Sequence, residues 1–561
     1  MSTYYSNVNV DLLNRIPATS KRVLEIGCGS GRMGQAFKSR NPSSQYFGVE
    51  VFDIVAQEAS AVLDGVVCAD IENDLTIPLK LAPGFDTLVF GDVLEHLRDP
   101  WRVLRELRQY IEPGGWCIAC IPNVAHWSVI SGLLEGKWTY EDAGLLDRTH
   151  LRFFTLDSAS EMFRTAGWST IDAKPRYVSP EKTEQALKTL LPSATAIGAP
   201  EARARVNMSA FQWVIRATNG PIQKVSSIAA IGQKKYAGVT EARIDYPMLT
   251  LQSLPETTTL WTDENIFISD DVRPGVLIMH RHTSSLTEDI DVFIAKGWTV
   301  VVDMDDDPNH FAQCLESDFA GYRGAHAVTV SNEHLAEIIR HLNPNVQIFE
   351  NAIFAIPPIA EKRTANQKLR IFFGALNRTS DWLPIIDGVN QAASQLKDDI
   401  EFVVIHDRAF HDALPSDVSK TFLPVVGIDK YMAALASCDI ALLPLNDTQF
   451  NRCKSDLKLI ECAAAQVAVI CSKVVYAHKP EHAEFAEFAT TSQEWRDAIL
   501  KLAKDRALIE TNTAKGLNYV KAKRMHAQQA PQRLAYYQSL IANRPQLEAQ
   551  RLERLALMAK T

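Results

Sequence analysis

Three glycines at alternate positions are the first residues whose spacing suggests chemistry. Residues 23–32 read VLEIGCGSGR, so Gly27, Gly29 and Gly31 follow a short apolar run, and a segment of helical character comes next. Glycine permits a tight turn and lets a ligand approach backbone N–H groups that a Cβ would shield. The pattern predicts a strand, a turn and a helix start that together hold a nucleotide-like ligand.

Acidic residues follow the next apolar runs. The run 45–50 ends in Glu50, and the run 65–69 is followed by Asp70 and Ile71. In dinucleotide-type sites an acid about 20 residues after the glycine turn accepts hydrogen bonds from ribose hydroxyls. A further run, 85–90, leads into the sequence GDVLEHL at 91–97, which begins with Gly91 and Asp92.

Alternating strands and helices must position these residues. We expect a leading helix over 4–19, a helix over 100–110, a Pro-Gly-Gly turn at 113–115 and a strand over 116–121. Such alternation is typical of a parallel sheet that binds its ligand at the carboxyl ends of the strands.

Residues 1–217 resemble a class I S-adenosylmethionine (SAM)-dependent methyltransferase, with a closing strand at 211–216. The resemblance implies SAM as the cofactor. The residues that match the cofactor-binding positions of that family are Glu25, Gly27, Gly29, Gly31, Glu50, Asp70, Ile71 and Asp92. Gly29-x-Gly31-x-x-Gly34 also fits an NAD-binding pattern, but that interpretation leaves Glu25, Gly27 and the Asp70–Ile71 pair without a use.

The methyl acceptor is less clearly indicated. Methyl transfer from a sulfonium is an in-line displacement that mainly needs an aligned acceptor, and a base helps when the acceptor is a hydroxyl. His126 and His150 are candidate bases, and fixing a loop is the alternative role for each. Asp92 is a third candidate catalytic residue, whereas His96 is expected to be structural. The sequence DRTHLRFFT at 147–155 resembles methyltransferases of surface-polysaccharide pathways.

A second series of strands and helices follows a linker at 218–224. The predicted strands are 225–231, 275–280, 298–303, 327–331 and 346–349, and then, after a hinge at 356–368, 369–373, 401–405, 440–444 and 467–471. Two Rossmann-like units joined by a hinge leave a cleft that suits two substrates.

This second half resembles a GT-B glycosyltransferase of the retaining kind related to family 4. The resemblance implies that Lys458 meets the diphosphate of a nucleotide-sugar donor and that Glu461, on the same helix face, meets its ribose. The helix start near Ser455 favours phosphate, and Arg378 supplies a second cation. A solvated ion pair is the alternative for Lys458 and Glu461. Where the family has a sugar-contacting glutamate, this chain has Cys453.

Four aspartates, at 303, 305, 306 and 307, have two interpretations. An Asp-x-Asp pair holds a divalent ion in GT-A transferases, and clustered carboxylates suit such ions generally. In a GT-B enzyme they lie at the cleft edge, where they orient sugar hydroxyls or begin a helix before Pro308. We favour the cleft edge, with Asp305 as a candidate catalytic residue and no metal site. His282 follows an apolar strand, at the position where related enzymes have a histidine in the catalytic site. Fixing the loop is an equally favoured role for this residue.

Composition narrows the class of protein. The chain has 561 residues, too many for one core, and its net charge of −9 argues against a general nucleic-acid binder. No apolar run reaches the ~18–20 residues of a membrane span, and the N-terminus lacks signal-peptide features. Nine cysteines without regular spacing indicate reduced thiols in a cytoplasm, and Cys117 and Cys120 are expected to be buried.

The predicted fold is therefore α/β. It comprises a Rossmann-like methyltransferase domain (1–217), a linker (218–224), two GT-B lobes (225–355 and 369–510) around a hinge (356–368), and C-terminal helices (511–561). The predicted function is SAM-dependent O-methylation, of a sugar, together with glycosyl transfer from a nucleotide sugar to a saccharide acceptor. The alternative is a methyltransferase whose second half is a non-catalytic glycan-binding module. The C-terminal helices are expected either to pack back across the cleft or to form a homo-oligomer contact, and their mixed charge makes a position on a membrane surface less favoured.

Overall fold

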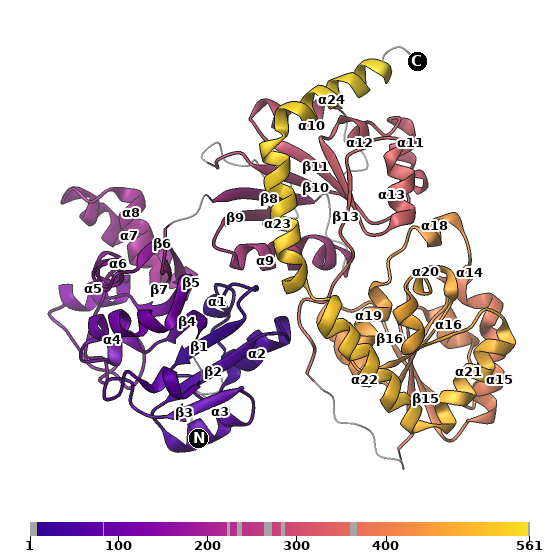
Figure 1. Ribbon diagram of the computed structural model, residues 1–561, viewed down its shortest axis with the longest axis horizontal. Coiled ribbons are helices and arrows are strands. Elements are labelled where there is room, and N and C mark those ends of the chain that lie inside the picture. The colour runs from indigo at the N-terminus through magenta and orange to yellow at the C-terminus, as the bar shows by residue number, and fades with distance from the viewer. Residues whose placement is uncertain are drawn as a thin grey trace. The chain divides into compact units, whose positions relative to one another are not determined.

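The computed structural model describes residues 8–81, 84–221, 225–232, 238–262, 272–281, 287–358 and 367–558. They form two compact units (Figure 1). The first comprises Met1–Val225 with Gln252–Glu256, and the second comprises Ser226–Leu251 with Thr257–Thr561. Among the described residues, no helix combines the length and apolar character that crossing a bilayer requires.

The first unit is built on a seven-stranded sheet in the order β3-β2-β1-β4-β5-β7-β6. The strands are β1 (Arg22–Ile26), β2 (Gln45–Glu50), β3 (Gly65–Cys68), β4 (Phe85–Gly91), β5 (Ile111–Pro122), β6 (Ser169–Tyr177) and β7 (Ala210–Thr218). All neighbours are parallel except β7, which runs antiparallel to β5 and β6. Leu24 and Ile26 enter one core and Val23 enters the other, so both faces of the sheet are covered.

In the first unit, helices form at the three places where the sequence predicted them, namely near the N-terminus, after the glycine turn and from Pro100, and further helices were not predicted. The helices are α1 (Val10–Leu13), α2 (Arg32–Arg40), α3 (Asp53–Ser60), α4 (Pro100–Leu107), α5 (Trp127–Leu134), α6 (Leu156–Thr165), α7 (Pro180–Ala196) and α8 (Glu201–Ser209). Within the described residues the expected leading helix is only α1, because the chain tightens into i→i+3 bonds at Arg15 and Ile16 before Pro17. The helix predicted to reach Tyr110 ends at Leu107 and continues as a 3-10 turn.

The second unit contains two six-stranded sheets that are parallel throughout. Their orders are β13-β12-β11-β10-β8-β9 and β16-β15-β14-β17-β18-β19. The strands are β8 (Ser226–Gly232), β9 (Thr257–Thr262), β10 (Val276–His280), β11 (Thr299–Met304), β12 (Ala327–Val330), β13 (Val346–Ile348), β14 (Leu369–Gly374), β15 (Ile400–Ile405), β16 (Ser419–Leu423), β17 (Ile440–Leu443), β18 (Ala468–Cys471) and β19 (Ala486–Phe488). The pairing is parallel at every junction.

Strands β6, β9, β16 and β19 were not predicted. Each is the last strand at one edge of its sheet, and among the described residues it pairs on one side alone. Threonine and charged residues replace the continuous apolar run there, so the sequence does not show the pattern of a buried parallel strand.

The chain ends in four helices that return to the first lobe of this unit. They are α21 (Ser492–Lys504), α22 (Arg506–Lys523), α23 (His526–Ala542) and α24 (Arg544–Met558). Helix α22 contacts the second lobe through α19 (Leu457–Ala464), whereas α23 and α24 lie along the first lobe (Figure 1). The Arg551 and Arg554 side chains donate to the carbonyls of Gly324 and Ala325 at 2.5 and 2.7 Å. The predicted packing of these helices across the unit is therefore observed.

Candidate functional sites

The glycine turn after β1 has the backbone that its sequence predicts. Gly27, Gly29 and Gly31 have φ angles of 72°, 53° and 78°, in the left-handed region that favours glycine. A Cβ at Gly27 would lie 2.5 Å from Cγ2 of Val93, so space as well as conformation excludes a side chain there. Gly31 is the N-cap of α2.

Glu50 at the end of β2 is held by backbone donors. Its Oε2 accepts from the Gly29 N–H at 2.9 Å, and its Oε1 accepts from the N–H groups of Val51 and Phe52 at 2.9 and 3.1 Å. The side chain is buried. The carboxylate is therefore fixed beside the glycine turn, and its remaining lone pairs can accept from ribose hydroxyls.

Glu25 on β1 is a buried acid with a different environment. Its Oε2 accepts from the Tyr46 hydroxyl at 3.0 Å. Burial raises the pKa of Glu25 to about 8; the Tyr46 hydrogen bond opposes this shift and the nearby Glu50 charge adds to it. The side chain is thus largely protonated at neutral pH and can both donate and accept.

The remaining predicted SAM positions lie at the ends of β3 and β4. Asp70 accepts from the Glu72 N–H at 2.9 Å, and Ile71 is buried in the core beside it. Asp92 has a φ of 56°, its carboxylate accepts from Gln212, and burial raises its pKa. The strand ends thus bring the predicted cofactor-binding positions to one edge of the sheet.

The two candidate bases lie in different settings. His126 is the N-cap of α5, where its Nδ1 accepts from the Ser128 N–H at 3.3 Å, and burial lowers its pKa to about 4. His150 is buried, with its Nδ1 3.2 Å from the Leu145 carbonyl, and burial lowers its pKa. These bonds support the loop-fixing alternative for both, and the role of either as a base stays a prediction.

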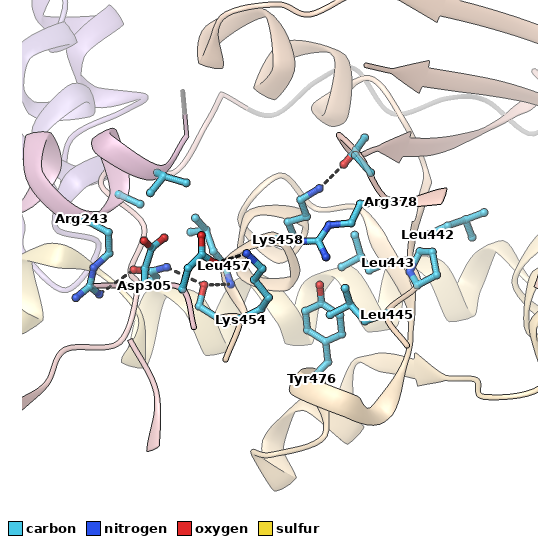
Figure 2. A pocket seen from close by; sticks show the side chains of 18 of the residues that line it. Arg243, Asp305, Arg378, Leu442, Leu443, Leu445, Lys454, Leu457, Lys458 and Tyr476 are labelled. Carbon is cyan, nitrogen blue, oxygen red and sulfur yellow. Dashed lines mark hydrogen bonds and ion pairs between the residues drawn. The ribbon is translucent and has the colours of Figure 1, made fainter. Parts of the chain in front are cut away.

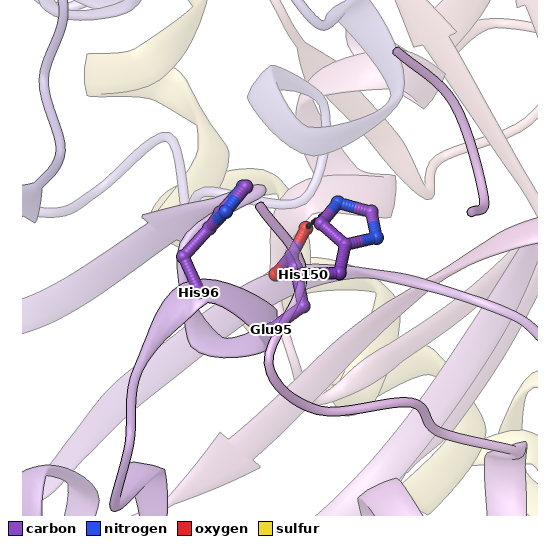
Figure 3. A group of neighbouring side chains, drawn as sticks. All are labelled: Glu95, His96 and His150. Atoms are coloured by element: carbon purple, nitrogen blue, oxygen red, sulfur yellow. Dashed lines mark ion pairs between the residues drawn. The ribbon is translucent and has the colours of Figure 1, made fainter. Parts of the chain in front are cut away.

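Sequence reasoning overlooked Glu95 as a functional residue and treated His96 as structural. Both lie in a 3-10 turn, Leu94–His96, beside His150 (Figure 3). The Glu95 carboxyl is 1% exposed, and burial raises its pKa well above the usual range. The available signal was the Glu-His pair directly after the strand end that carries Asp92.

In the second unit, a cavity of about 190 Å³ has a strongly cationic lining (Figure 2). Its walls come from the carboxyl ends of β14 and β17, the start of α19, and the loops that follow β10 and β11. The basic residues that line it are Arg243, Arg281, Arg378, Lys454 and Lys458. Carboxyl ends of parallel strands meet at one edge, which explains why separate segments converge here.

Lys458 and Arg378 lie next to each other in this cavity, as Figure 2 shows. Lys458 donates to the carbonyl of Gly374 at the end of β14. Burial lowers the pKa of Lys458 and raises the pKa of Glu461, one turn further along α19. Both side chains are half-buried, so the donor-binding role and the alternative of a solvated ion pair both stay predictions.

The start of α19 differs in detail from the prediction. Its N-cap is Asp456, and Ser455 precedes it with its hydroxyl accepting from Asn351 at 2.8 Å. The Asp456 carboxylate is paired with Arg524, whose Nη2 lies 2.7 Å from Oδ1. That guanidinium compensates an acid that would otherwise oppose phosphate binding at this helix end.

Asn451 positions Arg378 and was not predicted. Its Oδ1 accepts from Arg378 at 2.8 Å, while its Nδ2 donates to Asp381 at 2.7 Å and to the Asn446 carbonyl at 3.0 Å. The side chain is buried. Nothing in the local sequence marks this role, because the partners lie far apart in the chain.

The aspartate cluster divides into buried and cavity-lining members. Asp303 pairs with Arg243 inside the lobe at 2.6 Å, and Asp307 caps the turn that begins at Pro308. Asp305 accepts from Arg281 at 2.8 Å and lines the cavity. The predicted catalytic role of Asp305 remains a prediction.

A second aspartate, Asp306, also lines the cavity. Its carboxylate accepts from Arg281 and also from Lys454, so an ion pair joins the two lobes of this unit.

Cys453 is 0% exposed and packs in the core of the first lobe. A thiol in that place cannot reach a sugar. His282 lies outside the described residues.

Several known proteins are similar to part of this chain. A family model described as a methyltransferase domain matches residues 1–173. A ubiquinone biosynthesis O-methyltransferase of Cereibacter sphaeroides is 26% identical over 184 residues, covering 32% of this chain and 72% of the relative. A malonyl-[acyl-carrier protein] O-methyltransferase of Brevibacillus brevis is 22% identical over 204 residues, covering 36% and 71%. A SAM-dependent methyltransferase structure from Mesorhizobium loti aligns at 14% identity and a TM-score of 0.25, covering 37% and 96%.

Proposed function

We propose that this chain, whose residues 1–173 form a SAM-dependent methyltransferase domain, is a bifunctional enzyme of glycan biosynthesis. The first unit methylates an oxygen, on a sugar, with SAM as the methyl donor. The second unit transfers a sugar from a nucleotide-sugar donor to a saccharide acceptor. A glycan whose newly added sugar is then methylated would use both activities.

Methyl transfer is supported by the fit between the first site and the groups of SAM. Glu50 presents fixed acceptors for ribose hydroxyls, and Asp70 presents acceptors for an adenine amino group. SAM supplies an electrophilic methyl group on a sulfonium. Oxygen as the acceptor is supported by the two relatives, which are named O-methyltransferases.

Glycosyl transfer rests on one observation, the cationic cavity of the second unit. Arg378 and Lys458 lie together where the carboxyl ends of β14 and β17 meet the start of α19. A diphosphate placed there would accept charge-assisted hydrogen bonds from both side chains and would compensate their positive charges. Glu461 lies one turn along the same helix, within the reach expected for the ribose.

A second candidate function is favoured by Cys453. The buried thiol replaces the glutamate expected to contact the sugar, so the second unit lacks that contact. It would then act as a glycan-binding module that delivers an acceptor to the methyltransferase. This module would not cleave a nucleotide sugar.

Nucleotide binding to the full chain separates these functions. We expect one of UDP, GDP, ADP and CMP to bind in calorimetric titrations, and Lys458→Met to weaken it by about 10- to 100-fold through loss of a charge-assisted hydrogen bond. Lys515→Met, which changes an exposed lysine on α22, should leave the affinity unchanged. S-adenosylhomocysteine should bind both variants as it binds the wild type. Its binding without that of any nucleotide would contradict glycosyl transfer and favour the glycan-binding module.

A further inference from the structure

Two histidines and a carboxyl group converge beside the predicted SAM site. Glu95 and His96 come from the turn after β4, and His150 comes from the loop between α5 and α6. Each offers a ligand atom, and the three atoms lie within 4.8 Å of one another. Figure 3 shows the His150 ring next to the Glu95 carboxyl group, with His96 on its other side.

The Glu95 carboxyl group is buried without a hydrogen-bond partner among the described residues. Neither oxygen is paired within the part of the chain that the structure describes, and the residue is 1% exposed. Its backbone carbonyl accepts from the N–H groups of Leu151 and Arg152 at 2.8 and 3.0 Å, so the residue is held in place. A buried carboxylate without donors is strongly unfavourable, and it therefore requires a proton or a cation nearby.

A backbone carbonyl near Nδ1 orients each histidine ring. The Nδ1 of His150 lies 3.2 Å from the Leu145 carbonyl, and the Nδ1 of His96 lies 3.2 Å from the Thr149 carbonyl. A carbonyl can only accept, so these bonds place the proton on Nδ1 and leave a lone pair on each Nε2. Metal-binding histidines typically donate their other N–H to a carbonyl or carboxylate in this way.

The Nε2 atom of His150 lies near the Glu95 carboxyl group. The Nε2 of His150 lies 4.0 Å from Oε1 of Glu95. An unprotonated nitrogen and an ionised oxygen repel each other unless a positive charge lies between them. The loop 147–150 is itself fixed, because Asp147 accepts from the Thr149 N–H at 2.7 Å.

We propose that Glu95, His96 and His150 bind one divalent transition-metal cation, with Zn²⁺ as the fitting example. Two imidazoles and one carboxylate favour Zn²⁺ over Mg²⁺ or Ca²⁺. Zinc–ligand bonds of about 2.0–2.2 Å require donor atoms about 3–3.5 Å apart, so the side chains close inward on binding. Three protein ligands leave an open position for a further oxygen.

The function of this cation rests on the proposed O-methylation. The acceptor hydroxyl occupies the open position, where the positive charge makes it more acidic. Its proton passes to solvent, and the oxygen lone pair attacks the methyl carbon of SAM. The carbon–sulfur bond breaks, its electrons go to sulfur, and S-adenosylhomocysteine and a methyl ether are formed. The metal is not oxidised or reduced.

Cobalt binding to the full chain tests the site without any acceptor. After treatment with a chelator, the wild type should bind one Co²⁺ at this site, with visible d–d absorption that Zn²⁺ abolishes and Mg²⁺ does not. Glu95→Gln and His150→Gln should weaken binding by about 100-fold or more. His334→Gln is the matched control, because His334 and Glu337 form a surface pair at 3.8 Å. S-adenosylhomocysteine binding shows that each variant is folded.

The outcomes separate this inference from the proposed function. Absence of Co²⁺ and Zn²⁺ binding, or equal affinity in wild type, Glu95→Gln and His150→Gln, overturns the metal site. Metal binding that depends on these residues supports it, whether or not a sugar is methylated. Methylation of a saccharide that proceeds equally in the metal-free and Zn²⁺-loaded enzyme overturns the catalytic function of the cation and leaves O-methylation standing.

Discussion

The predicted SAM site of the first unit and the cationic cavity of the second are built in different ways. The first is formed mainly by backbone: three glycines in the left-handed conformation and a glutamate held by N–H groups of neighbouring residues. The second is formed by long side chains from separate elements, with Arg378 held by Asn451 and Lys458 held by the Gly374 carbonyl. A contiguous site is visible in a sequence, whereas a convergent one depends on the fold.

The two sites differ in charge, and the charge of each is complementary to its expected ligand. The hydrogen-bonded carboxylates of Glu50 and Asp70 lie at the first site, which suits the hydroxyl and amino groups of SAM. Cations surround the second site, which suits phosphates. The comparison predicts that a ligand of one site should not respond to changes in the other.

Gly27→Ala should give the largest effect and should affect only the first site. A Cβ would meet Val93 at 2.5 Å on a backbone with a φ of 72°, so the turn must move. We expect S-adenosylhomocysteine affinity to fall by more than about 100-fold and the unit to lose about 2–4 kcal/mol of stability. Calorimetric titration and urea unfolding measure the two effects.

Gly136→Ala is the matched control for this change. Gly136 has nearly the same φ, 73°, but nothing lies within 4 Å of its Cβ position. It should lose only about 1–2 kcal/mol of stability and retain S-adenosylhomocysteine affinity. Equal losses of affinity in both variants would show that backbone strain, and not the crowded turn, determines binding.

Asn451→Ala should give an intermediate effect confined to the second site. The change removes the hydrogen bonds to Arg378, Asp381 and the Asn446 carbonyl. Among the described residues, Arg378 would then be held by Asp381 alone, at 3.1 Å, and we expect nucleotide affinity to fall by about tenfold, which corresponds to about 1.4 kcal/mol. Asn390→Ala removes a 3.0 Å bond to the Ala413 carbonyl in the same lobe and should leave the affinity unchanged. A full-affinity Asn451→Ala protein would contradict the positioning role.

Glu25→Gln should change the pH dependence of stability. Burial raises the pKa of Glu25 to about 8, so its folded form binds a proton more tightly than its unfolded form, whose pKa is near 4.5. The stability from this group is therefore fully present below pH 4.5 and is lost as the pH rises toward 8. Relative to Glu25→Gln, the wild type should lose at most about 1.4 kcal/mol per pH unit in this window. Urea unfolding at pH 5, 6, 7 and 8 measures the difference, and parallel pH profiles would contradict the raised pKa.

The sequence allowed the central strands of all three sheets to be predicted, because parallel strands buried on both faces appear as continuous apolar runs. It did not reveal edge strands such as β9, whose residues lack that pattern. The sequence also predicted too long a leading helix. Apolar residues near the N-terminus suggested more helical residues than the described backbone forms.

The sequence by itself determined the α/β fold, the glycine turn and the acids that follow β2 and β3, because these depend on short segments with characteristic conformations. Only the tertiary structure decided which distant side chains meet. It buried Cys453 in the core of a lobe, joined Asn451 to Arg378, and brought His150 to Glu95 without a hydrogen bond to the carboxyl group. The physical reason is that hydrogen bonds, burial and charge act over a few ångströms in space, whatever the separation along the chain.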